Sequence, residues 1–282
     1  MDPLCYPGNF GVSTFSALNY YFNSSIDSNR SYIKTGKLFI PGGSMNFIPV
    51  LSTVVTFIFA VAVFNRYRYR KGTHLLMWGI GLILYGLGTL SEVILSLTFS
   101  GFVLKIWYLS GAMLTAAWLG QGTIWLLVRK PGIARGLTYF LAAISLLAIV
   151  LVMAAPLTPA AASYNISQPI SAQYKEILVR SGLITALTII LNIYGTIALV
   201  GGALYSAYLF LRKRVLLNRV IGNILIAAGA LMPAMAGSFV GAGLVDWLYL
   251  SELLGVILMY TGFVQATVSR PVEKKEPMMV QS

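Results

Sequence analysis

The chain has 282 residues, of which 57% are hydrophobic and 10% are charged, with a formal net charge of +12. Soluble domains carry about 25% charged residues, so this composition indicates an integral membrane protein. One cysteine, Cys5, and one histidine, His74, exclude an internal disulfide framework, a cysteine-based metal cluster, bis-histidine haem ligation and the usual zinc sites within the chain.

Seven apolar runs follow a polar N-terminal segment. Each run is long enough to cross a hydrocarbon core of roughly 30 Å as a helix. In chain order they cover residues 47–64, 75–97, 106–128, 136–155, 183–211, 220–243 and 247–268. The sequence therefore predicts an all-α fold, a bundle of seven transmembrane helices over 46–268. An extracytoplasmic segment over 1–45 precedes it, and a cytoplasmic tail over 269–282 follows it.

The lysines and arginines predict the orientation of the bundle, because positive side chains gather in cytoplasmic loops. With the N-terminus outside, 14 of the 20 lysines and arginines fall on the inner side, many of them at 66–71, 129–135 and 212–219. We therefore expect a multi-pass protein of the cell membrane with its C-terminus in the cytoplasm. The positive charge follows from this topology, so the expected partner is the lipid bilayer and not nucleic acid.

Three Asn-x-Ser triplets, at Asn23, Asn29 and Asn165, are candidate glycosylation sites. Two of them lie in the N-terminal segment and the third lies in the polar link at 156–180, so all three fall on the predicted outer side. The alternative is that polar outer loops produce such triplets by chance.

Two glutamates lie at a matched depth inside the predicted spans. Glu92 is near the outer end of the second run and Glu252 is near the outer start of the seventh. A charged carboxylate at the bilayer centre costs about 2.5–3.5 kcal/mol on insertion scales, so it normally faces the bundle or water. Tyr85 shares the face of Glu92. We expect an outward-facing site for a cation, a proton or a polar ligand; alternatively, each glutamate pairs with a tyrosine, a serine or Lys105.

Further amides lie deeper in the predicted spans. Gln121 in the third run is flanked by Trp118 and Trp125 at helical spacing, and Asn192 lies in the fifth run. This strip of indole and amide groups could line a pocket for an apolar ligand. The alternative is helix–helix packing with one amide hydrogen bond.

The sequence also carries a faint internal repeat. Gly79 and Gly86 of the second run match Gly222 and Gly229 of the sixth at a constant offset. A parallel duplication of three helices, a connecting helix and three helices is the layout of SWEET-type transporters. The alternative is that apolar helices share letters because they draw on few residue types.

Three stretches, at 107–123, 192–214 and 218–234, carry a resemblance to a family of uncharacterised bacterial seven-helix membrane proteins. The resemblance covers roughly residues 71–268 and implies the fold and the membrane location, not a reaction. The layout is also similar to that of SWEET proteins and microbial opsins. The seventh run contains no lysine, however, so no retinal Schiff base can form there.

Three hypotheses for the function follow. The first is a non-enzymatic sensor or carrier component that binds a small or lipid-like ligand in an outward-facing intramembrane pocket. The second is a SWEET-like transporter, and the third is an accessory subunit of a larger membrane complex or homo-oligomer. No catalytic residues, metal ligands or cofactor motif are recognisable, so an intramembrane enzyme is not expected.

Overall fold

The computed structural model describes residues 38–40, 43–45, 47–128, 130–212, 217–241 and 246–267. The chain forms two units, Met1–Phe47 and Ile48–Ser282. In the first unit, β1 (Leu38–Ile40) pairs antiparallel with β2 (Gly43–Met45), a strand pair that the sequence analysis did not predict. Asn23, Asn29 and the tail at 269–282 lie outside the described residues.

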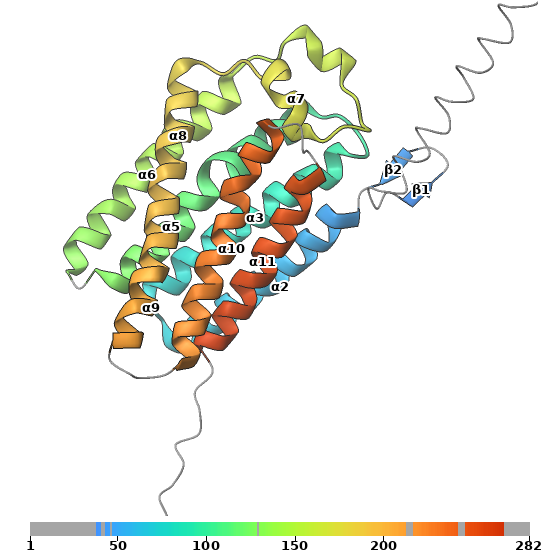
Figure 1. Cartoon of the computed structure of the whole chain (residues 1–282). Helices are drawn as coiled ribbons and strands as arrows, with labels where there is room; N and C mark the ends of the chain where they lie inside the picture. The colour runs from blue at the N-terminus through green and yellow to red at the C-terminus, as the bar shows by residue number, and fades with distance from the viewer. Residues whose placement is uncertain are drawn as a thin grey trace, which may run out of the picture. The chain divides into compact units, whose positions relative to one another are not determined.

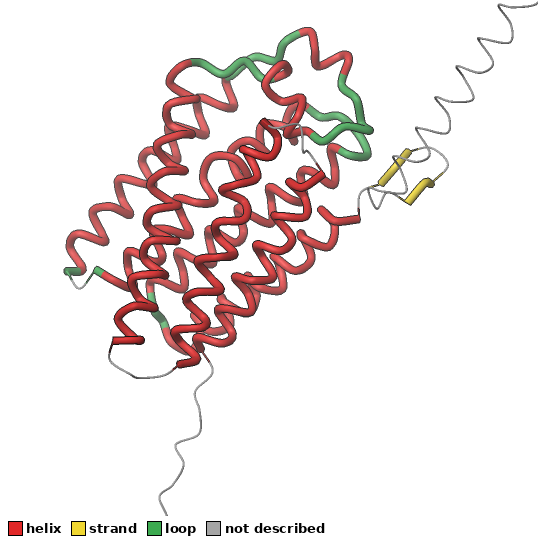
Figure 2. The backbone as a smooth tube through the Cα atoms, viewed as in Figure 1, coloured by secondary structure: helices red, strands yellow, loops and turns green. Residues whose placement is uncertain are grey.

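The second unit is a bundle of helices (Figures 1 and 2). Six helices are long and apolar enough to cross a membrane. They are α2 (Phe47–Arg70), α3 (Thr73–Leu95), Gly101–Leu127, α6 (Pro131–Ala154), Gly182–Arg212 and α11 (Asp246–Thr267), whose apolar part is Leu248–Thr267. The protein is therefore a multi-pass helical membrane protein. A further helix, α10 (Leu217–Gly241), has 25 residues and a shorter apolar section, Leu217–Pro233, within the part described.

Two of the helices, α4 (Gly101–Trp107) and α8 (Gly182–Thr196), begin at a serine cap. The side chain of Ser100 accepts a hydrogen bond from the backbone N–H of Val103, and Ser181 does the same for Ile184, which satisfies backbone donors that have no partner within the helix. The link at 156–180, which the sequence analysis identified only as polar, contains local helical structure. It contains a 3₁₀ turn, η2 (Pro159–Ser163), and a short helix, α7 (Ile170–Ile177).

Two of the long helices contain π-helical turns, which the sequence analysis did not predict. The first long helix consists of α4 (Gly101–Trp107), η1 (Tyr108–Leu114) and α5 (Thr115–Leu127). The second consists of α8 (Gly182–Thr196), η3 (Ile197–Gly201) and α9 (Gly202–Arg212). In η1, the backbone N–H of Thr115 bonds to the carbonyl of Ser110, five residues back. Such turns occur frequently at functional sites.

Glycines bring α10 and α11 into backbone contact. A Cβ atom added at Gly222 would lie 2.6 Å from the carbonyl oxygen of Gly262, and one added at Gly229 would lie 2.6 Å from that of Gly255. Small residues allow this close approach, which supplies van der Waals contact that a lipid environment otherwise lacks. Pro233 has no backbone N–H, so the carbonyl of Gly229 does not receive the usual helical hydrogen bond from it. This carbonyl faces Gly255 of α11.

The matching glycines of α3 have different neighbours. Gly79 packs against the ring of Phe64 and Gly86 packs against the ring of Phe57, both on α2. Gly222 and Gly229 instead contact α11. The sequence echo between the second and sixth runs therefore does not correspond to equivalent helix contacts at these positions.

We expect Gly229→Ala to destabilise the bundle by about 1–3 kcal/mol, because the added methyl group must displace backbone atoms and overpacks the contact. Thermal unfolding of the purified protein in detergent measures this effect. Gly136→Ala is the matched control, since a Cβ atom there meets nothing within 4 Å. Equal losses in the two variants would contradict the packing role of Gly229.

Candidate functional site

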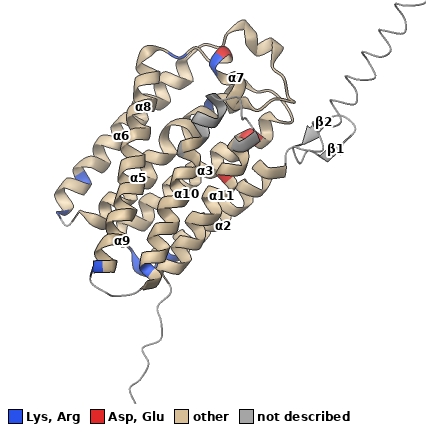
Figure 3. Ribbon diagram, viewed as in Figure 1, with Lys and Arg blue, Asp and Glu red and all other residues tan. Residues whose placement is uncertain are grey.

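A cavity of about 560 Å³ lies inside the bundle, in the half nearest α7. Helices α3, α5, α8, α10 and α11 contribute to its wall, together with η1 and α7. Of the candidate residues from the sequence, Glu92, Glu252, Tyr85 and Asn192 line this cavity. The described acidic side chains lie in the half of the bundle nearest α7, and basic side chains lie at both ends of the bundle (Figure 3).

Glu92 projects from α3 and is almost fully buried, with 4% of its surface exposed. The indole Nε1 of Trp107 donates a hydrogen bond of 2.9 Å to its Oε1. The ring of Trp107 packs edge-on against Tyr174 of α7, with 5.2 Å between ring centroids. The other carboxyl oxygen, Oε2, receives no hydrogen bond from any donor in the described part of the chain.

Glu252 comes from the first turns of α11 and meets Glu92 across the cavity. The hydroxyl of Tyr85, on α3, donates a 2.9 Å hydrogen bond to the backbone carbonyl of Glu252 and so joins the two helices. Oε2 of Glu252 is enclosed and, like that of Glu92, lacks a donor among the described residues. The side chains of Glu92 and Glu252 line the same cavity.

Positive side chains line the same cavity on the α7 side. Lys175 and Arg180 both contribute to the wall. The guanidinium of Arg180 lies over the ring of Tyr174, with Cζ 5.1 Å from the ring centroid. Its Nε is buried and has no acceptor among the described residues. The cavity therefore has two acids, on α3 and α11, and two bases on the α7 side.

The link outside the spans supplies phenol groups that stay neutral at physiological pH. Burial raises the pKa of Tyr174, and the positive charge of Arg180 partly opposes this shift. Burial raises the pKa of Tyr164 to about 12, with a further contribution from the negative charge of Glu92. The hydroxyl of Tyr164 donates to the carbonyl of Leu95 at the end of α3, which ties the link to the helix that carries Glu92.

On the other side of the cavity, polar side chains have hydrogen-bond partners within the protein. Asn192 donates from its amide nitrogen to the carbonyls of Ala112 and Thr188, each at 2.8 Å. The hydroxyls of Tyr108 and Thr188 share a hydrogen bond of 2.9 Å. Asn192 therefore joins α8 to η1, and its amide hydrogens are used in that contact.

The structure places Trp118, Gln121 and Trp125 away from the cavity, at the contact between α5 and α6. Gln121 donates to the carbonyl of Ala134 at 3.0 Å and to the hydroxyl of Thr138 at 2.7 Å. Trp125 donates to the same hydroxyl, and Trp118 donates to Ser145. All three side chains hydrogen bond to residues of α6, and Gln121 also accepts a hydrogen bond from the hydroxyl of Tyr194 on α8. A ligand-binding role for these residues remains a prediction.

The Nζ of Lys105 donates to the backbone carbonyl of Met153 at 2.8 Å, so the partner that the described residues give it is a carbonyl and not a glutamate. Asn165 is exposed, and its side-chain oxygen accepts a hydrogen bond from the backbone of Ser167. Glycosylation at Asn165 remains a prediction.

The sequence analysis missed Trp107, Tyr174, Lys175 and Arg180 as cavity residues. Trp107 could have been found, because it begins the third run at the depth of Glu92. The other three lie in the polar link or in α7, whose folding back over the bundle leaves no signal in hydropathy. No protein-family model, curated protein or solved structure matches this chain.

We expect Trp107→Phe to lower stability by about 1–3 kcal/mol, because it leaves the buried carboxyl group of Glu92 without its indole donor. Thermal unfolding in detergent measures the change. In a Glu92→Leu background the same substitution should cost much less, since no carboxyl group is left unpaired. Equal costs of Trp107→Phe in the two backgrounds would show that the hydrogen bond contributes nothing.

Proposed function

We propose that this protein is a seven-helix receptor or carrier component of the cell membrane that binds a small or lipid-like ligand in the cavity around Glu92 and Glu252. The N-terminus is outside, the C-terminus is in the cytoplasm, and the α7 side of the bundle faces the exterior. α10 is the seventh span, since 25 helical residues reach about 37 Å at 1.5 Å per residue.

One observation carries the proposal: carboxyl groups from two helices far apart in the sequence, α3 and α11, line one cavity, each with an oxygen that no donor among the described residues uses. Buried polar atoms are normally satisfied, and leaving one unpaired costs about 1–3 kcal/mol. A ligand that donates hydrogen bonds, such as an amine, would satisfy both oxygens. A volume of about 560 Å³ falls within the range of about 300–1,000 Å³ that is usual for small-molecule sites.

The cavity walls favour an amphiphilic ligand. Aliphatic side chains of Leu119, Leu199 and Met259 line the part of the cavity between the helices. A polar head would lie at the two glutamates, and an apolar part would contact these side chains. Arg180 and Lys175 would attract any anionic group on the same ligand.

The orientation predicts how single cysteines react with a membrane-impermeant maleimide in a Cys5→Ser background. Gln168→Cys, in the exposed link, should be labelled in intact cells. Tyr69→Cys, which is 89% exposed, and Ser282→Cys should be labelled only after the membrane is permeabilised. Labelling of both Gln168→Cys and Ser282→Cys in intact cells would mean an even number of spans between them and would reject α10 as a span.

The ligand proposal predicts that dodecylamine raises the thermal unfolding midpoint of the protein in neutral detergent, whereas dodecanol does not. In the double variant Glu92→Gln and Glu252→Gln, the apparent affinity for dodecylamine should fall by about tenfold or more, since a carboxylate binds an ammonium group more strongly than an amide does.

Glu176→Gln serves as the control for charge alone, because Glu176 is exposed and does not line the cavity. Unchanged dodecylamine binding and unchanged stability in the double variant would reject a shared carboxylate site. Transport by a SWEET-like duplication rests on the sequence echo alone, and a role as an accessory subunit remains a prediction that co-purification at fixed stoichiometry would test.

A further inference from the structure

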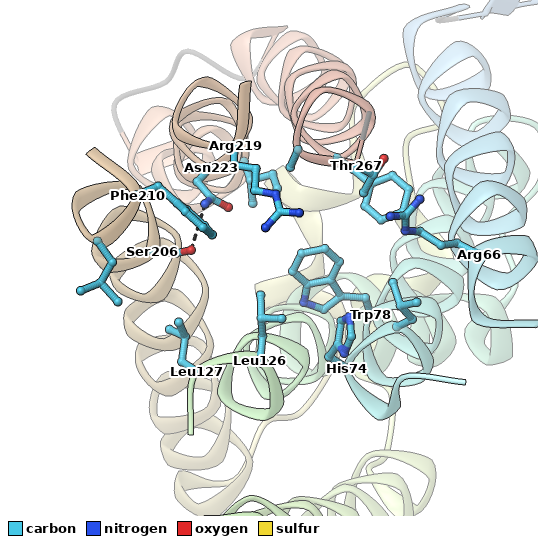
Figure 4. Close-up of a pocket in the computed structure, with 15 residues that line it drawn as sticks. Arg66, His74, Trp78, Leu126, Leu127, Ser206, Phe210, Arg219, Asn223 and Thr267 are labelled. Atoms are coloured by element: carbon cyan, nitrogen blue, oxygen red, sulfur yellow. Dashed lines mark hydrogen bonds between the residues drawn. The ribbon is translucent and has the colours of Figure 1, made fainter. Parts of the chain in front are cut away.

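A second cavity, of about 430 Å³, lies at the other end of the bundle (Figure 4). It is separate from the glutamate cavity and shares none of its lining residues. Arg66 of α2 and Arg219 of α10 approach it from opposite sides, with Trp78 and His74 of α3 between them (Figure 4). No acidic side chain lines the cavity within the described residues.

The two arginines line this space from two different helices. The guanidinium of Arg219 lies over the ring of Phe210, with Cζ 5.5 Å from the centroid. Arg66 leaves the last turns of α2, and its charge lies close enough to that of Arg219 for the two to repel each other. Two like charges across one cavity are unfavourable when it holds only water, so an anion between them is favoured.

Hydrogen-bonding groups accompany the arginines. The amide of Asn223 donates to the hydroxyl of Ser206 at 2.9 Å and closes the wall between α10 and α9. Nε1 of Trp78 is enclosed and has no acceptor among the described residues. Guanidinium groups bind phosphate with two parallel hydrogen bonds, and a phosphate has enough oxygens to accept from both arginines.

The remaining wall is apolar. Leu126, Leu209 and Phe263 line the cavity beside the charged groups. A phospholipid fits this combination of arginines and apolar side chains better than a free phosphate does, because its acyl chain would cover the apolar side chains. Basic pockets between transmembrane helices on the cytoplasmic side bind the headgroups of anionic lipids in this way.

We propose that this cavity binds the phosphate group of an anionic phospholipid between Arg66 and Arg219, with an acyl chain against the leucine and phenylalanine side chains. This site is independent of the ligand proposed for the glutamate cavity. A lipid held here would join α2, α3, α9, α10 and α11 at the end of the bundle that carries most of the basic residues.

The test is to titrate the purified full-length protein in detergent with dioleoyl-phosphatidylglycerol or with dioleoyl-phosphatidylcholine and to follow the thermal midpoint and lipid retention in native mass spectrometry. The wild type should bind phosphatidylglycerol selectively. The double variant Arg66→Gln and Arg219→Gln should bind it about tenfold more weakly. Arg68→Gln, on the same helix but exposed, should behave like the wild type.

Equal retention of phosphatidylglycerol in the wild type and the double variant, or equal binding of phosphatidylcholine by the wild type, would overturn the proposal. So would protection by inorganic phosphate that matches protection by the lipid, which would assign the site to a soluble anion. If the double variant does not purify, Arg219→Lys keeps the charge but not the two-pronged geometry. It should retain less phosphatidylglycerol than Arg68→Gln does.

Discussion

Contact between backbones at glycines determines where the two acids of the cavity lie. Gly255, three residues after Glu252, packs against Gly229 of α10, and Gly88, four residues before Glu92, packs against the Cα of Gly111 in η1. Helices in lipid gain no hydrophobic free energy by associating, so such contacts and interhelical hydrogen bonds hold them together. A side chain at any of these glycines would separate the helices one turn away from a carboxyl group.

The sequence predicted most of the membrane architecture, because long apolar runs and the placement of positive charge are direct consequences of a bilayer. The six helices that meet the length and composition expected of a span coincide with predicted runs. The short helix α7 and the two π-helical turns could not be predicted. α7 contains charged residues and is too short to span, and a π-helical turn has the same hydropathy as the helix around it.

The site was predictable in part. Glu92, Glu252, Tyr85 and Asn192 share one cavity, and the two glutamates could be paired because charge inside a membrane must face the protein interior. The strip around Gln121 shows the limit of this reasoning. This face of the helix packs on α6. The sequence does not show which helices are in contact, so it does not indicate which polar face meets a cavity and which meets another helix.

The π-helical turn η1 makes the number of residues in its helix as important as their identity. Each residue of an α-helix advances the side-chain direction by about 100°, and a π-helical turn accommodates one residue more than an α-helical turn. If one residue were removed between Tyr108 and Leu114 and the helix became regular, the segment before it would rotate as a block. The indole of Trp107 would then point away from Glu92 although no residue at the site had been substituted. A homologous chain with one residue fewer in this turn would therefore lose the hydrogen bond from the indole to Glu92, even if it kept both glutamates and the tryptophan.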